Sequence, residues 1–407
     1  MHSSISSSDL ENEFQTLERG TEMQVRLKLF VAGMLVAATV IGLYLALTSV
    51  VPLNGRVLGM MDYLPTYLEE NRDRQKMLIF GSSMVQAGFE PYQFDAHLEE
   101  EGIDVVSINY GVGNLDPEFQ QYLTRDARRK LEAAGQKLDL TLLEFNPFQT
   151  TLARGAFGNI TRDQNEAILL TPADLWAITL KDPDRGIRMF NIRWFRNGIS
   201  AQMLSSFLTI SGDEVIPGRE EETALARERR NELNRNFQDS LPADVEMLLA
   251  EWDQKLRGGR IDKRLLPAES LEALQAYVDS FRAPVLLASD RQRRILQGDI
   301  EELGFDERLI QAFINMVNDL KAVSVNMEVV LLPRNTQLIV YTPEVQQKLD
   351  RLMQRITAET GVPVRDFQDH PEISSEHFLD STHLSFGSGI DAYTKVLAET
   401  NAEFLRE

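Results

Sequence analysis

The feature that most restricts this chain is an uninterrupted apolar segment near its N-terminus. The segment Leu29–Val51 is 23 residues long and contains no charged side chain. A helix rises about 1.5 Å per residue, so a helix of this length spans a hydrocarbon core of roughly 30 Å. A buried helix of a soluble protein is rarely apolar on every face for so long, and the apolar part of a signal peptide is usually shorter. The segment therefore predicts an uncleaved transmembrane helix.

The charges around this segment predict its orientation. Three cationic side chains precede it and only one follows it closely, namely Arg19, Arg26 and Lys28 and then Arg56. Positive charge is enriched on the cytoplasmic side of membrane proteins. We therefore predict a cytoplasmic tail over residues 1–28, a single transmembrane helix over residues 29–53 in the cell (inner) membrane, and an extracytoplasmic or periplasmic remainder.

The composition excludes several classes of function. Asp and Glu number 62 against 42 Lys and Arg, which leaves a net charge of −20. Non-specific nucleic-acid binding requires an excess of cations, so we expect no nucleic-acid partner. The absence of cysteine excludes disulfides, thiolate metal sites and cysteine nucleophiles. Only five histidines occur, and their spacing near the C-terminus matches no familiar ligand pattern, so we expect neither a metal nor a cofactor.

Beyond the apolar segment, short apolar runs alternate with helical patterns. Five runs predict buried strands: Lys76–Gly81, Val105–Gly111, Leu140–Phe145, Met327–Pro333 and Val362–Phe367. Five patterns predict helices: Pro91–Glu101, Pro117–Ala134, Asp306–Ala322, Pro343–Thr360 and Gly389–Arg406. Strands that alternate with helices favour an α/β fold, here a three-layer sandwich around a mainly parallel five-stranded sheet of the flavodoxin-like kind.

The alternation stops between residues 151 and 305. This stretch contains all three tryptophans and a charge-rich helical pattern, Arg219–Phe237. We predict a mainly helical insertion or cap over residues 151–305, which divides the α/β domain into a first part, residues 54–150, and a second part, residues 306–407.

Two segments of the insertion leave alternatives open. Ala283–Ser289 is apolar and could form an extra strand. The stretch Arg185–Ile210 mixes aromatic side chains with arginines. It could pack against the sheet in the ordinary way, or it could lie on a membrane surface or on a partner.

Polar residues follow the predicted strands at the edge where parallel sheets bind ligands. Asp380 and His383 come after the fifth strand and are three residues apart, so both side chains can face the same way. The carboxylate could then hold Nδ1–H of the imidazole while Nε2 accepts the proton of the Ser83 hydroxyl, which follows the first strand. We predict Ser83 as nucleophile, His383 as general base and Asp380 as its partner.

An acyl-transfer site also needs donors for an oxyanion. The backbone N–H groups of Ser83 and Gly111 and the side chain of Asn146, after the third strand, could supply them. Some of these residues could have a structural role instead. A Ser at a helix start is often an N-cap, and Asp380 could cap the last helix. Arg334, after the fourth strand, could bind an anionic or sugar substrate or form a salt bridge.

The order of these residues resembles the SGNH (GDSL-like) hydrolase family. The blocks are Gly81-Ser82-Ser83-Met84, Asn109-Tyr110-Gly111, Asn146, and Asp380 with His383. The resemblance covers roughly residues 76–150 and 325–400. The chain departs from the family pattern in having Ser82 where an Asp usually precedes the nucleophile, and in lacking a Gly two residues before Asn146.

The N-terminal anchor, the Gly-Ser-Ser block and the C-terminal Asp-x-x-His-Leu-Ser are similar to membrane-tethered SGNH proteins of cell-envelope acylation. These include the D-alanine transfer (DltD-like) and the alginate O-acetylation (AlgJ- and AlgX-like) proteins. The resemblance implies a serine-dependent O-acyltransferase or esterase that acts on acyl groups of a cell-surface polymer beside a membrane-bound O-acyltransferase. A non-catalytic scaffold or binding subunit of a polysaccharide modification complex is the alternative.

Overall fold

The computed structural model describes residues 28–43, 55–113, 116–153, 167, 170–195, 216–242, 257–258 and 266–406. Residues 28–43 form a helix with exposed apolar side chains, Leu29 and Leu35 among them. The rest of the predicted transmembrane segment and nearly all of the predicted cytoplasmic tail lie outside the described residues. Among the described helices, none combines the length and the apolar character needed to cross a bilayer.

The centre of the molecule is a sheet of five parallel strands in the order β2-β1-β3-β4-β5. The strands are β1 (Gln75–Gly81), β2 (Val105–Gly111), β3 (Leu138–Glu144), β4 (Ser324–Leu331) and β5 (Val364–Asp366). They correspond to the five predicted apolar runs, and the α/β prediction with a five-stranded parallel sheet is confirmed. Near-continuous apolar runs are typical of strands that are covered on both faces.

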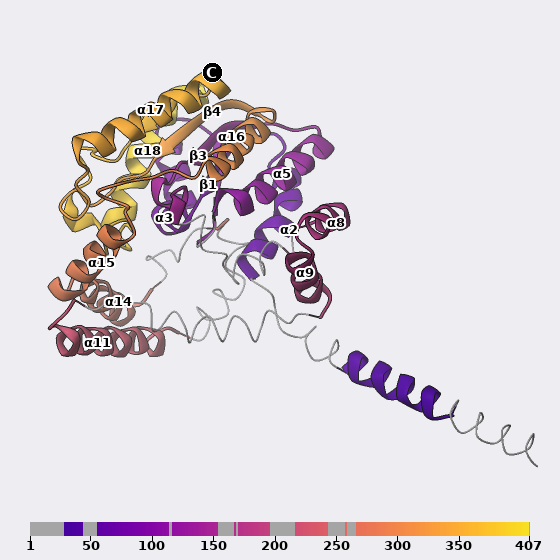
Figure 1. Cartoon of the computed structure of the whole chain (residues 1–407). Helices are drawn as coiled ribbons and strands as arrows, with labels where there is room; N and C mark the ends of the chain where they lie inside the picture. Colours follow the sequence, from indigo (N-terminus) through magenta and orange to yellow (C-terminus); the bar gives the residue numbers. More distant parts are fainter. Residues whose placement is uncertain are drawn as a thin grey trace, which may run out of the picture.

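Helices cover both faces of this sheet and make three layers (Figure 1). One face is covered by α2 (Gly55–Glu70), α5 (Pro117–Ala134), α16 (Glu307–Lys321) and α17 (Pro343–Thr360). The other face is covered by α3 (Ser83–Gly88), α4 (Pro91–Glu100) and α18 (Ser388–Arg406). Alternation along β1 shows the division: Leu78 and Phe80 join the first core, while Met77 and Ile79 join the second.

Two helices begin and end where the sequence predicts, because their ends carry strong local signals. Helix α5 starts with Pro117 after the cap Asp116, whose side chain accepts the N–H of Phe119, and stops at Gly135 in the left-handed conformation with φ 63°. Helix α17 has the same pattern, with Pro343 after the cap Thr342 and a left-handed Gly361. Pro at the first helical position and Gly after the last are the preferred residues there.

The described part of the insertion is helical, as predicted. Its helices are α8 (Pro172–Lys181), α9 (Pro183–Phe195), α11 (Glu220–Asp239), α14 (Ala268–Ser280) and α15 (Pro284–Leu296). The chain leaves and returns at one place, where Thr151 and Phe305 form an antiparallel bridge. The end of the stretch Arg185–Ile210, from residue 196 on, lies outside the described residues.

One expectation from the sequence needs correction, and one helix is not among those predicted. The strand considered for Ala283–Ser289 is wrong, because Pro284 opens helix α15 there. A short apolar run does not by itself distinguish a strand from a buried helical segment. Helix α2 was not predicted at all. It contains Pro65, which removes a backbone donor and makes the segment resemble a loop in sequence.

Candidate active site

Ser83 lies at the tight turn from β1 into α3. Ser82 is the N-cap of α3, and its Oγ accepts the N–H of Met84 at 3.1 Å. The turn requires Gly81, because a Cβ there would collide with Glu144 Oε2 and with Val85 Cγ2. Ser83 therefore stands at the first residue of a helix at the carboxyl edge of the sheet, partly exposed.

Asp380 and His383 lie in a short loop that is closed by its own hydrogen bonds. Phe378 and Leu384 form an antiparallel bridge, and the N–H of Leu379 donates to the carbonyl of His383 at 2.8 Å. One oxygen of Asp380 accepts the N–H groups of Thr382 and His383, each at 2.8 Å. The alternative that Asp380 caps the last helix is wrong, since α18 begins only at Ser388.

The structure brings Ser83, His383 and Asp380 together in one chain of hydrogen bonds. Ser83 Oγ lies 2.9 Å from His383 Nε2, and His383 Nδ1 lies 2.8 Å from Asp380 Oδ2. With the proton on Nδ1, the imidazole donates to the carboxylate and Nε2 accepts from the serine hydroxyl, as in a serine hydrolase triad. The side chains of His383 and Asp380 are each 30% exposed, so a substrate can approach them.

Electrostatics favour the ionised form of both members of the pair. Burial alone would raise the pKa of Asp380, but the charge and hydrogen bond of His383, with two backbone N–H donors, hold that pKa well below its usual range. Burial alone would lower the pKa of His383, but the Asp380 carboxylate raises it above its ordinary value. Asp380 thus stabilises the imidazolium that forms when His383 accepts a proton.

Glu144 is a member of the site that sequence reasoning missed. It ends β3, is buried, and accepts the N–H of Ser82 at 2.5 Å and the hydroxyl of Ser82 at 2.9 Å. Burial raises the pKa of Glu144 to about 7 despite these hydrogen bonds, which act in the opposite direction. The available signal was a carboxyl at the end of an apolar strand, since Glu is rarely buried without partners.

The predicted oxyanion donors differ in how they are engaged. The N–H of Ser83 belongs to the first turn of α3, where a helix has no internal acceptor. The amide nitrogen of Asn146 donates to Ser82 Oγ at 3.1 Å and to Met84 Sδ at 3.4 Å. The N–H of Gly111 donates to Asn109 Oδ1 at 2.9 Å. Gly111 ends strand β2, as the predicted strand Val105–Gly111 does.

Gly113, which the sequence did not single out, lies closer to the serine. A Cβ at Gly113 would be 3.3 Å from Ser83 Cβ, whereas a Cβ at Gly111 would collide with the backbone of Gln86. The N–H of Gly113 donates to the side chain of Gln86, at 2.8 Å from Oε1. The side chain of Gln86 thus occupies a backbone donor beside Ser83.

Arg334 has contacts of a structural kind. Its guanidinium is 3.2 Å from both carboxylate oxygens of Asp369 and stacks 4.1 Å from the ring centroid of Tyr341. The adjacent Asn335 donates its N–H to the carbonyl of Ser381 at 3.1 Å. These contacts fit the salt-bridge alternative and connect the loop after β4 to the loop of Asp380.

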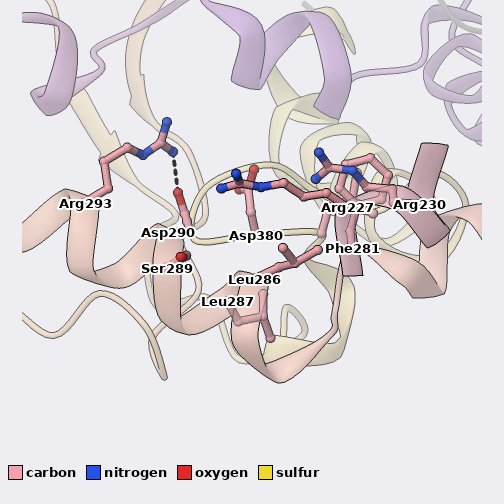
Figure 2. Close-up of a pocket in the computed structure, with 10 residues that line it drawn as sticks. Arg227, Arg230, Phe281, Leu286, Leu287, Ser289, Asp290, Arg293 and Asp380 are labelled. Carbon is pink, nitrogen blue, oxygen red and sulfur yellow. Dashed lines mark hydrogen bonds and ion pairs between the residues drawn. The ribbon is translucent and has the colours of Figure 1, made fainter. Parts of the chain in front are cut away.

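The insertion supports the Asp380 loop from outside. Asp290 of α15 accepts the N–H of Ser381 at 3.0 Å, and Arg294 donates to Thr382 Oγ1 at 3.3 Å. A cavity of about 140 Å³ lies between this loop and helices α11 and α15 (Figure 2). Asp380 lines this cavity, but Ser83 and His383 do not.

No group of three or more His, Asp or Glu side chains suited to a metal ion occurs among the described residues. No model of a known protein family matches the chain, and no curated protein is significantly similar to it.

Proposed function

We propose that the chain is a membrane-anchored, extracytoplasmic serine acyltransferase or esterase of the SGNH type, which acts on acyl groups of a cell-surface polymer. The observation that supports this proposal most is the hydrogen-bond chain from Ser83 through His383 to Asp380. Its location adds support, because the strand order reverses between β1 and β3, and open parallel sheets bind ligands at the carboxyl ends around such a point.

The proposed reaction has two halves. Ser83 Oγ attacks the acyl carbonyl while His383 Nε2 takes the hydroxyl proton, and a tetrahedral oxyanion forms. The oxyanion collapses, the bond to the leaving alcohol breaks, and His383 returns the proton to that alcohol. An ester of Ser83 remains. A polymer hydroxyl, or water in an esterase, then loses its proton to His383 and attacks this ester. The second oxyanion collapses, the bond between the acyl carbon and Ser83 Oγ breaks, and His383 returns the proton to Ser83 Oγ, which leaves the acyl group on its acceptor.

Oxyanion stabilisation in this proposal uses donors near the start of α3. The N–H of Ser83 benefits from its helix terminus, which favours negative charge. Asn146 becomes a donor if its amide turns from Met84 Sδ, at 3.4 Å, toward the substrate. The N–H of Gly113 becomes an oxyanion donor when the Gln86 side chain moves aside. It fits this role better than the N–H of Gly111, which donates to Asn109.

The second candidate function is a non-catalytic scaffold or binding subunit of an envelope modification complex. One observation favours it: of the three predicted oxyanion donors, Gly111 and Asn146 are engaged by protein groups. A scaffold retains the fold but does not acylate Ser83.

A fluorophosphonate probe distinguishes the two candidates. We expect the full-length chain in detergent micelles to be labelled and to hydrolyse a short-chain acyl ester, and Ser83→Ala to lose both properties. Ser388→Ala, at an exposed serine, is the matched control and should keep both. Absence of labelling in a folded native chain would refute the enzymatic proposal. Acyl transfer to an added polysaccharide, measured by mass, then separates a transferase from an esterase.

A further inference from the structure

The α8–α9 hairpin of the insertion exposes large apolar side chains. Trp176 and Leu180 of α8 are 64% and 67% exposed, and Ile187 of α9 is 57% exposed. Trp176 and Leu180 are four residues apart and therefore share one face of α8. Single, scattered apolar side chains are normal on a protein surface, but here several large ones are exposed on two consecutive helices.

The opposite side of the same hairpin is packed. Leu175 and Met189 are buried and form a small cluster with Tyr122 of α5. The two helices approach closely at Gly186, where a Cβ would collide with Thr179. The exposed residues are therefore held on a fixed platform, and the ordinary-packing alternative for this part of Arg185–Ile210 does not account for Ile187.

The position of the hairpin in the fold relates it to the predicted anchor. Helix α2 begins at Gly55, four residues after Val51, and four extended residues span at most about 14 Å. The first turns of α2 pack on α5, where Lys130 Nζ donates to the carbonyl of Met61 at 2.7 Å. The hairpin packs on Tyr122 of the same helix, eight residues or about 12 Å along the axis from Lys130.

Figure 1 shows α8 and α9 near α2 at the right of the view, away from α11, α14 and α15 at the lower left. A chain whose apolar segment ended at Val51 in a bilayer would begin α2 within about 14 Å of that segment, and α2 packs on the same helix α5 that carries the hairpin. The chemistry of the hairpin fits a place at the bilayer surface. Trp is enriched at membrane interfaces, and the exposed cations Lys181 and Arg188 accompany the apolar side chains, in a chain with a net charge of −20.

We propose that the α8–α9 hairpin rests in the interface of the same bilayer that holds the N-terminal segment, with Trp176, Leu180 and Ile187 among the lipid headgroups and upper acyl chains. This inference rests on the membrane anchorage in the proposed function. The hairpin would act as a second contact, which fixes the orientation of the α/β domain on the membrane.

Site-directed spin labels test this proposal, and the absence of native cysteine makes them simple to place. We would reconstitute full-length Leu180→Cys and Ile187→Cys, each carrying a nitroxide, at one chain per phosphatidylcholine–phosphatidylglycerol nanodisc. Val325→Cys, at an exposed position at the start of β4, is the matched control. Accessibility to lipid-soluble oxygen and to a water-soluble nickel complex is measured for each.

We expect the oxygen-to-nickel accessibility ratio at positions 180 and 187 to exceed that at position 325 several-fold. Equal ratios at all three positions, in a chain that has entered the nanodisc, would overturn the inference and leave the anchorage intact. Failure to enter nanodiscs would overturn both. A raised ratio at positions 180 and 187 that appears only with two chains per nanodisc would also overturn the inference, because it would indicate contact between copies of the chain. Fluorophosphonate labelling of Ser83, if present in the native chain, checks that each variant is folded.

Discussion

The sheet body and the insertion use apolar residues in opposite ways. In the body, two large cores on either side of the sheet bury nearly every apolar strand residue, and polar side chains gather at the carboxyl edge. The described insertion has only two small clusters and exposes Trp176, Leu180 and Leu225. A thick core holds catalytic groups at fixed distances, whereas thin helical layers provide surfaces for other contacts.

The insertion itself divides along the same line. Helices α11, α14 and α15 face the Asp380 loop, where Asp290 and Arg294 hydrogen-bond to Ser381 and Thr382. Helices α8 and α9 pack on Tyr122 of α5 and present apolar side chains outward. One part thus supports the loop of the proposed triad, and the other carries the surface that we propose to contact the membrane. Each of the following measurements would sharpen or break this distinction.

The largest effect is expected at the carboxyl edge of the body. Asp380→Asn should lower kcat for ester hydrolysis by about 10⁴-fold, or about 5 kcal/mol, the loss typical of this change in a serine triad. Asp380 raises the pKa of His383, so its replacement should also move the acid limb of kcat/KM to lower pH. An unchanged acid limb would contradict the assignment of His383 as base. Asp290→Asn, in the insertion, should lower kcat less than Asp380→Asn does.

The next effect concerns the core of the body. Leu142 is fully buried in β3, and Leu142→Ala removes methyl groups from a packed interior. We expect a loss of about 2–5 kcal/mol in the free energy of unfolding, because the cavity cannot fully collapse. Chemical denaturation monitored by near-ultraviolet circular dichroism measures this loss. A loss below 1 kcal/mol would show that the body is as loosely packed as the insertion.

A third effect comes from Glu144 and depends on pH. Its pKa in the folded chain is about 7, above the value of 4.5 expected when unfolded. The folded chain therefore binds the proton of Glu144 more tightly than the unfolded chain does, which adds about 3 kcal/mol to the free energy of unfolding below pH 4.5. This contribution is lost as the pH rises from about 4.5 through 7. Glu144→Gln should lack this part of the pH dependence in thermal unfolding. Parallel stability curves for the two chains would rule the idea out.

The smallest effect is expected on the exposed face of the insertion. Leu180→Ala makes the same chemical change as Leu142→Ala, but at a position that is 67% exposed. Its free energy of unfolding in detergent should stay within about 0.5 kcal/mol of the native value. Measuring both variants side by side tests the contrast directly, and a loss of several kcal/mol at Leu180 would mean that this face is covered.

The sheet could be predicted from the sequence because its signals are local. Buried parallel strands are short apolar runs, and Pro and Gly mark the ends of α5 and α17. The same rules misread Ala283–Ser289, where a buried face of a helix resembles a strand, and overlooked α2 because of Pro65. Both errors arose where tertiary packing, and not the local pattern, decides the conformation.

The convergence of Ser83, His383 and Asp380 was predictable from their order and their places after strands. The environment of Ser82 was not. Its hydrogen bonds to Glu144 depend on the register between β1 and β3, where Phe80 is opposite Leu143. The orientation of the Gly111 N–H toward Asn109 is likewise a property of how β2 ends. Such details require coordinates, because a pattern of residue types contains no distances.

Ser83 and His383 are separated by 300 positions along the chain. During synthesis at about 5–20 residues per second, the imidazole is added roughly 15 to 60 s after the hydroxyl. Throughout that interval the growing polypeptide has Ser83 but lacks the imidazole that we propose to activate it. In the proposed mechanism the triad is therefore complete only after His383 has been added, and a product that stops short of this residue would lack the proposed base.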